Sequence, residues 1–235
     1  MPEQIVNFYN QLYKSKQSQA MRPITEYSRF LSYLKLLEAD KKILDIACGT
    51  GFLLKVANEK GLKTFGIDIS DEAVKIAKEN SPSSEIITAS AENLPFENIF
   101  FDYVSCLGSI EHFLDINQGL REMLRVGKSG AKFLLVVPNK NYFVWWFTKN
   151  KGTHQRDFQE ELKSLKEWRD IFNNLGFKIL DIYQDDWPSR CLPWFYSFNP
   201  IKILKRLFFK LAWLILPLNY TYQFIFICQK NIVKI

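Results

Sequence analysis

Two periods of hydrophobic residues alternate along this chain of 235 residues. Short runs that are apolar on both faces, such as Phe133-Leu134-Leu135-Val136-Val137, are typical of strands in a parallel sheet that helices cover. Between these runs lie segments with apolar residues at helical spacing, such as residues 52–60. The alternation predicts an α/β fold made of repeated strand–helix units.

The expected elements follow one another in a regular order. Two helices, 4–19 and 25–37, precede the first strand and belong to an N-terminal helical cap over residues 1–40. Strands are expected at 43–47, 63–68, 85–89, 101–107, 131–137, 177–183 and 222–228. Further helices are expected at 52–60, 71–79, 116–124 and 164–175. We therefore expect one domain over residues 1–235.

A long apolar insertion, residues 184–220, separates the last two expected strands. Within it a helix is expected at 201–216, because Asn199-Pro200 is a good helix start. Its face opposite the apolar one carries four cations, which interrupt any stretch long enough to cross a bilayer: Lys202, Lys205, Arg206 and Lys210. Three interpretations stay open: a helix at the membrane–water interface, a lid over the protein's own substrate, or a homodimer contact.

Charge is distributed unevenly between the two halves of the chain. Residues 1–119 carry 12 basic and 16 acidic side chains, and residues 120–235 carry 19 and 9, so the halves are near −4 and +10. A basic half indicates nucleic acid, an anionic membrane surface or an acidic substrate, unless its lysines are simply solvated. The four cysteines are far apart and no signal peptide precedes them, which favours a reduced, cytoplasmic protein without disulfides.

The run Leu44-Asp45-Ile46-Ala47-Cys48-Gly49-Thr50-Gly51 carries the first candidate chemistry. An apolar strand leads into an acid and then into a Gly-x-Gly turn, where the backbone is able to approach a ligand closely. The helix expected after it would direct its free N–H groups at an anionic group. The third glycine of a dinucleotide-binding turn is absent, which argues against a nicotinamide-dependent oxidoreductase.

A second acid, Asp68, ends the next strand about twenty residues later, where a carboxylate accepts both hydroxyls of a ribose. Together the two motifs resemble the class I S-adenosylmethionine-dependent methyltransferases. The chain is similar to the small-molecule branch of that family, and to ubiquinone/menaquinone-type enzymes in particular, at four further stretches: Ala91 to Phe96, Phe101 to Val104, Glu111-His112-Phe113 and Pro138-Asn139.

This resemblance implies a fold and a cofactor. The fold is a Rossmann-like sheet of seven strands, mostly parallel with an antiparallel last strand, with helices on both faces. The cofactor is S-adenosyl-L-methionine, with its ammonium near Asp45 and its ribose at Asp68. Many relatives have an acid at the position of Ser90 that bonds the adenine amino group. The implied cofactor-binding residues are Tyr13, Asp45, Ala47, Cys48, Gly49, Gly51, Asp68, Ile69, Ala91, Glu92 and Leu107.

The resemblance also implies methyl transfer, most readily to an oxygen of a small or lipid-linked acceptor. If a hydroxyl attacks, a base is useful, and the two histidines, His112 and His154, are the catalytic candidates. His154 lies in Gly152-Thr153-His154, similar to a stretch of quinone-precursor O-methyltransferases. No metal site is expected, although Glu111, His112 and Asp115 are readable as ligands because some relatives depend on a divalent ion.

Other functions fit the sequence less well. After the fourth strand the chain lacks the Pro-Pro-aromatic pattern of base-amino methylation, so nucleic acid is not the expected acceptor. A paired set of acids for arginine methylation is not evident around Glu111. The alternative of another class is a non-catalytic S-adenosylmethionine-binding subunit or regulator. The expected location is the cytoplasm, with peripheral membrane contact as one reading of the insertion.

Overall fold

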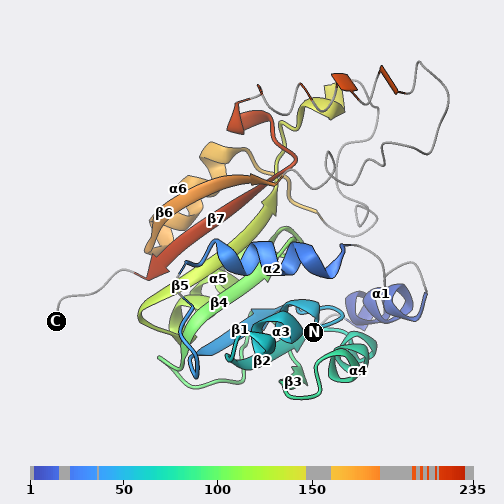
Figure 1. The fold of residues 1–235 in the computed structure, drawn as a ribbon, viewed down its shortest axis with the longest axis vertical. Coiled ribbons are helices and arrows are strands. Elements are labelled where there is room, and N and C mark those ends of the chain that lie inside the picture. The colour runs from blue at the N-terminus through green and yellow to red at the C-terminus, as the bar shows by residue number, and fades with distance from the viewer. Residues whose placement is uncertain are drawn as a thin grey trace.

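The computed structural model describes residues 3–15, 22–35, 37–146, 160–185, 203–204, 207–208, 211, 215 and 217–230. A seven-stranded sheet forms the centre of the fold, with strand order β3-β2-β1-β4-β5-β7-β6 (Figure 1). The strands are β1 (Lys42–Ile46), β2 (Lys63–Asp68), β3 (Glu85–Thr88), β4 (Phe101–Leu107), β5 (Gly127–Pro138), β6 (Phe177–Asp185) and β7 (Gln223–Lys230).

The first five strands are parallel, whereas β7 runs antiparallel to both of its neighbours, β5 and β6. The expected mostly parallel sheet with an antiparallel last strand is thereby confirmed. The α-helices are α1 (Glu3–Lys14), α2 (Ile24–Ser32), α3 (Phe52–Glu59), α4 (Asp71–Asn80), α5 (Ile116–Val126) and α6 (Leu165–Leu175). Short 3-10 helices are η2 (Ile110–His112), η3 (Phe143–Trp146) and η4 (Leu218–Tyr220).

Both faces of the sheet are covered, as strands without a polar face require. Ile43 of β1 packs with α2 and α3 on one face, while its neighbour Leu44 packs with α5 and α6 on the other. Successive side chains of a strand point to opposite faces, so a run of apolar residues serves two cores. The continuous apolar runs in the sequence therefore reflect burial of the strands on both faces of the sheet.

Several element boundaries differ from the expected ones. The first helix ends at Lys14 rather than at residue 19, and α2 ends at Ser32 rather than at 37. β5 begins at Gly127, four residues before the expected start, because Gly127 pairs with Phe101 across an irregularity in the β4–β5 register. Of the expected helix 201–216, the described residues are helical. The remainder of that helix lies outside the described residues, and the single-domain assignment stays a prediction.

A buried charge network attaches the N-terminal region to the far edge of the sheet. Arg22 and Arg29 donate to the two carboxyl oxygens of Asp185 at 2.7 and 2.9 Å, and Asp185 is fully buried. Arg29 also pairs with Glu26 at 2.9 Å. The two guanidinium groups neutralise and hydrogen-bond the Asp185 carboxylate, whose charge would otherwise be costly to bury. The network fixes α2 against the end of β6.

Candidate functional site

The turn after β1 has backbone conformations and close packing that favour glycine. Ala47, Gly49 and Gly51 have φ values of 55°, 52° and 77°, a region that side chains rarely tolerate. A Cβ on Gly51 would lie 2.9 Å from both Cα and Cβ of Ala77 in α4. A Cβ on Gly49 would lie 2.9 Å from the Tyr13 hydroxyl of α1. Gly51 is therefore required by the backbone of α4 that packs against it, and Gly49 is favoured by its positive φ.

Asp68, the last residue of β2, holds this turn in place. Its Oδ2 accepts a hydrogen bond from the Gly49 amide at 2.9 Å, and its Oδ1 accepts from the Ser70 amide at 3.0 Å. The residue is 4% exposed, and burial raises the pKa of its carboxyl to about 6 against the lowering effect of these amides. The carboxylate retains lone pairs for further donors at the site.

Asp45 lies on the neighbouring strand and is equally buried, with 3% of its surface exposed. Its Oδ1 accepts from the Ser105 hydroxyl at 2.7 Å. Burial raises the pKa of Asp45 to about 7; the Ser105 bond lowers it, and the negative charge of Asp68 raises it again. Two buried carboxyls with raised pKa values favour a bound cation, which stabilises their ionised forms.

The other expected cofactor residues lie at the same edge of the sheet, because β1, β2, β3 and β4 are parallel and in register there. Ile69 directly follows β2, and Leu107 ends β4; both are half-buried. Ala91 and Cys48 are each 8% exposed. The structure therefore brings these residues together around one edge, as ligand sites in open α/β sheets require.

Ser90 and Glu92 interact with each other at this edge. The Ser90 hydroxyl donates to Glu92 Oε2, and Glu92 Oε1 accepts from the Leu114 amide at 2.9 Å. Ser90 therefore holds the Glu92 carboxylate at this edge of the sheet.

Helix α1 lies across the turn. Asn10 accepts from the Ser70 hydroxyl at 2.6 Å, and the Tyr13 hydroxyl lies next to Gly49. Burial raises the pKa of Tyr9, as do the negative charges of Glu111, Asp68 and Glu160 in that order. Tyr9 is therefore placed between the Asp68 region and a second polar cluster.

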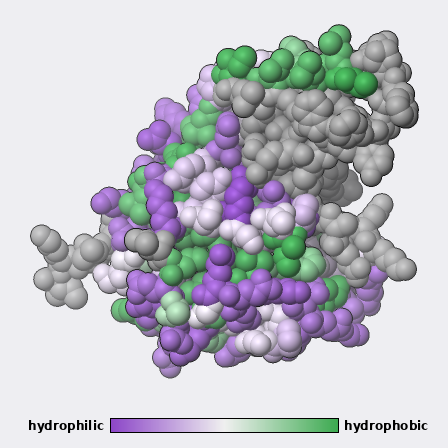
Figure 2. Space-filling view, viewed as in Figure 1, coloured by the Kyte–Doolittle hydropathy of each residue, from purple (hydrophilic) through white to green (hydrophobic). Residues whose placement is uncertain are grey.

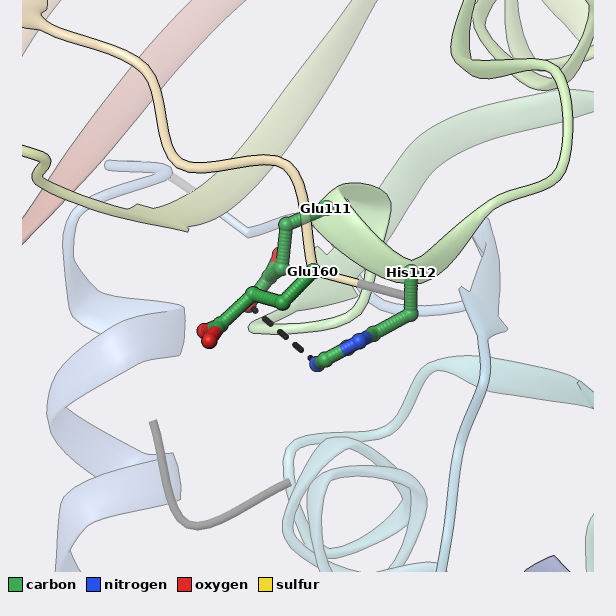
Figure 3. A group of neighbouring side chains, drawn as sticks. All are labelled: Glu111, His112 and Glu160. Carbon is green, nitrogen blue, oxygen red and sulfur yellow. Dashed lines mark ion pairs between the residues drawn. The ribbon is translucent and has the colours of Figure 1, made fainter. Parts of the chain in front are cut away.

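That second cluster consists of Glu111, His112 and Glu160 (Figure 3). His112 Nε2 lies 4.0 Å from Glu111 Oε1, and one ligand atom from each of the three side chains lies within 4.8 Å of the others. Glu111 and His112 belong to η2, which follows β4. Glu160 reaches them because the Glu161 amide donates to the Glu111 carbonyl at 2.9 Å.

Glu111 differs from the other two members of the cluster in being buried. It is 1% exposed, and within the described residues nothing donates a hydrogen bond to its two carboxyl oxygens from another side chain or amide. Burial raises its pKa to about 8, and the charge of Glu160 raises it further, although its own backbone amide lowers it. The pKa of this carboxyl therefore lies above neutral pH.

The structure replaces one residue of the ligand set considered from the sequence. Asp115 is not part of the cluster: it caps α5 by accepting from the Gln118 amide at 2.9 Å. Its place is taken by Glu160, which no local pattern identified. Two carboxylates and an imidazole are donors that suit several divalent cations. His154 lies outside the described residues.

Comparisons with known proteins point to one kind of enzyme. A family model described as a methyltransferase domain matches residues 44–135. A ubiquinone/menaquinone biosynthesis C-methyltransferase of Campylobacter jejuni is 38% identical over 173 residues, which cover 62% of this chain and 74% of that enzyme. An uncharacterized protein of Methanocaldococcus jannaschii is 35% identical over 157 residues, 66% of this chain. The chain spans only 57% of the length of that archaeal relative.

Among solved structures, the phosphoethanolamine N-methyltransferase 2 of Haemonchus contortus in complex with S-adenosyl-L-methionine superimposes with a TM-score of 0.61. The match covers 88% of this chain and 52% of that one at 18% identity. At this identity the likeness establishes the fold alone.

Proposed function

The chain belongs to the class I S-adenosylmethionine-dependent methyltransferases, and from that premise we propose that it methylates an oxygen of a small or lipid-linked acceptor. S-adenosyl-L-methionine is the cofactor of the family. The observation that carries the proposal is the pair of buried acids, Asp45 and Asp68, on adjacent strands either side of a glycine turn. A sulfonium nucleoside offers the cation and the ribose hydroxyls that this pair favours.

Each part of the cofactor has a proposed partner. Its amino-acid end lies over the turn from Cys48 to Gly51, with Asp45 for the ammonium, and Tyr13 covers this end. Asp68 accepts from the ribose hydroxyls. Adenine lies between Ile69 and Leu107, with Glu92 near its amino group. The shared sheet edge and the hydrogen bonds that hold Asp68 and Glu92 in place support these assignments.

Methyl transfer from a sulfonium is an in-line displacement. The acceptor oxygen forms a bond to the methyl carbon, the carbon–sulfur bond breaks with its electron pair remaining on sulfur, and the hydroxyl proton leaves. The protein supplies alignment, exclusion of water and a place for that proton. We assign the last role to His112, whose Nε2 lies 4.0 Å from Glu111, with His154 as the second candidate.

A second candidate acceptor is a ring carbon of a quinol, because the Campylobacter relative is named a C-methyltransferase of ubiquinone/menaquinone biosynthesis. Both chemistries remove a proton from an aromatic hydroxyl system and use the same base. A screen with isotopically labelled S-adenosylmethionine against lipid extracts, followed by mass spectrometry of the product, distinguishes an O-methyl from a C-methyl group.

The first test of the proposed function is cofactor binding. Calorimetry is expected to give micromolar affinity for S-adenosylmethionine and no detectable binding of NAD, since a ribose acceptor is present without the third glycine of a dinucleotide turn. Binding without turnover of any lipid extract would favour the non-catalytic subunit instead. Binding of NAD alone would overturn the assignment.

Removal of metal ions tests how the cluster works. We expect turnover in excess EDTA to remain within about twofold, because the three donors do not form a closed ligand set. The measurement compares initial rates before and after chelation. Activity that disappears with EDTA and returns with Mg²⁺ or Mn²⁺ would instead assign a divalent cation to Glu111, His112 and Glu160.

A further inference from the structure

An apolar ridge lies on the outer surface of the insertion. We define it by the six described residues there that are helical and exposed: Ile203 (45%), Leu204 (69%), Leu207 (42%), Phe208 (59%), Leu211 (50%) and Ile215 (80%). Figure 2 shows hydrophobic side chains in a row along the upper edge of the molecule. Single exposed apolar residues are ordinary, whereas a contiguous set marks an interaction surface.

The ridge positions occupy one side of the helix that the sequence predicts at 201–216. At about 100° per residue, these six positions fall within an arc of roughly 140°. A lid would bury this side against the protein's own substrate face, but the ridge residues are exposed. The orientation therefore argues against the lid and leaves a membrane or a second copy of the chain as the occupant.

Charge distinguishes between these two occupants. No acidic residue follows Asp186, whereas residues 187–235 contain seven basic ones: Arg190, Lys202, Lys205, Arg206, Lys210, Lys230 and Lys234. A two-fold dimer would bring identical cationic segments together, which is repulsive. An anionic lipid surface attracts the basic segment instead, and long basic side chains on the polar face of an interfacial helix are able to reach the lipid headgroups.

Position in the fold links the ridge to the site. β6 ends at Asp185 and β7 begins at Gln223, so the insertion leaves and re-enters the sheet at the edge where β5 ends. Trp146 of η3, which is 66% exposed, lies with its ring 5.3 Å from that of Tyr220 in η4. Exposed tryptophan and tyrosine are typical of the membrane interface. The described helices include none that is long and apolar enough to cross a bilayer.

We propose that the apolar ridge inserts into the interface of an anionic phospholipid membrane and holds the carboxyl edge of the sheet towards the lipid. Peripheral attachment of this kind combines buried apolar area with attraction between cations and anionic headgroups. Its consequence for the acceptor, that it is lipid-linked and enters from the membrane, rests on the proposed function. The attachment itself does not.

The test is co-sedimentation of the full chain with vesicles. One set is phosphatidylcholine alone, and the other contains about 30% phosphatidylserine as the anionic lipid. We expect binding to the anionic vesicles only, and at least a tenfold loss of partitioning for the double variant Leu204→Glu/Ile215→Glu. The matched control is Ile99→Glu, because Ile99 is 61% exposed but lies in the loop before β4. This control is expected to bind as the wild type does.

Each other outcome contradicts the attachment. Equal sedimentation of the wild type and the double variant would show that the ridge does not cause membrane binding. A dimer in light scattering that the double variant abolishes, without vesicle binding, would assign the ridge to a second copy of the chain. Calorimetry with S-adenosylmethionine on the same samples reports the cofactor site separately, so failure of membrane binding and failure of the proposed function remain distinguishable.

Discussion

Asp68→Ala is expected to weaken the binding of S-adenosylmethionine by about 100-fold. The substitution would remove the charge-assisted hydrogen bonds that the Asp68 carboxylate accepts from the ribose, each of which contributes about 1.5–3 kcal/mol. It also holds the Gly49 and Ser70 amides at 2.9 and 3.0 Å, so its removal loosens the glycine turn. Titration calorimetry measures the dissociation constant directly, and circular dichroism reports whether the fold is retained.

The matched control for this change is Asp71→Ala. Asp71 begins α4 three residues further on, is exposed, and accepts from Thr88 at 2.6 Å rather than from the turn. We expect its affinity for the cofactor to stay within about threefold of the wild type, as for other surface substitutions away from the site. An Asp68→Ala protein that is folded and binds the cofactor as tightly as this control would contradict the assignment of Asp68 as the acceptor for the ribose hydroxyls.

At a pH above 8, where the Glu111 carboxyl is ionised, Glu111→Gln is expected to lower the turnover number by about two orders of magnitude while leaving cofactor affinity unchanged. The substitution keeps the volume of the side chain and removes a carboxyl that lies 4.0 Å from His112 Nε2. An ionised carboxylate there stabilises the imidazolium that forms when His112 takes the acceptor's proton, and general-base catalysis contributes roughly 10²–10⁴-fold. Initial rates with a methyl acceptor found by the screen measure the effect.

The pH dependence makes this prediction more specific. Because the pKa of Glu111 is raised to about 8, the rate of the wild type should rise with pH through this value and the Glu111→Gln rate should not. Glu161→Gln is the control, since its side chain is exposed and its backbone bond to Glu111 is kept. A Glu111→Gln enzyme with the rate and pH profile of the control would exclude Glu111 from the reaction.

The same pKa determines the sign of a stability effect. The folded protein binds the Glu111 proton more tightly than the unfolded chain does, because the ordinary pKa of the group is 4.5. This contribution is therefore fully present at low pH and is lost as the pH rises from about 4.5 to about 8. Thermal denaturation of the wild type should show a steeper loss of stability over this window than Glu111→Gln does.

Much of the fold follows from hydrophobic period alone. β2 and β4 begin and end where the sequence predicts, because each is a run of residues buried on both faces and bounded by turn residues. The early start of β5 was missed since its first four residues, Gly-Lys-Ser-Gly, have no strand pattern and are ordered by pairing with β4. Tertiary pairing decided that boundary, and local preference did not.

Part of the candidate site is predictable from the sequence and part depends on tertiary contacts. The glycine turn and both acids were readable because their chemistry lies next to strand ends in the sequence. Glu160 was not, since it is 49 residues away from Glu111 in the chain and reaches it only through the bond from the Glu161 amide. Contacts of this kind depend on where a connecting segment crosses the sheet edge, which no periodic pattern specifies.

Helix α1 has a consequence for the catalytic cycle. It covers the turn with Tyr13, and its polar attachments to α4 include the Asn10–Ser70 bond and an exposed Lys14–Glu72 pair at 3.5 Å. A spent nucleoside beneath such a cover departs only when these twelve residues lift away. The few polar attachments of α1 to α4 would favour that opening, and so the exchange of used for fresh cofactor.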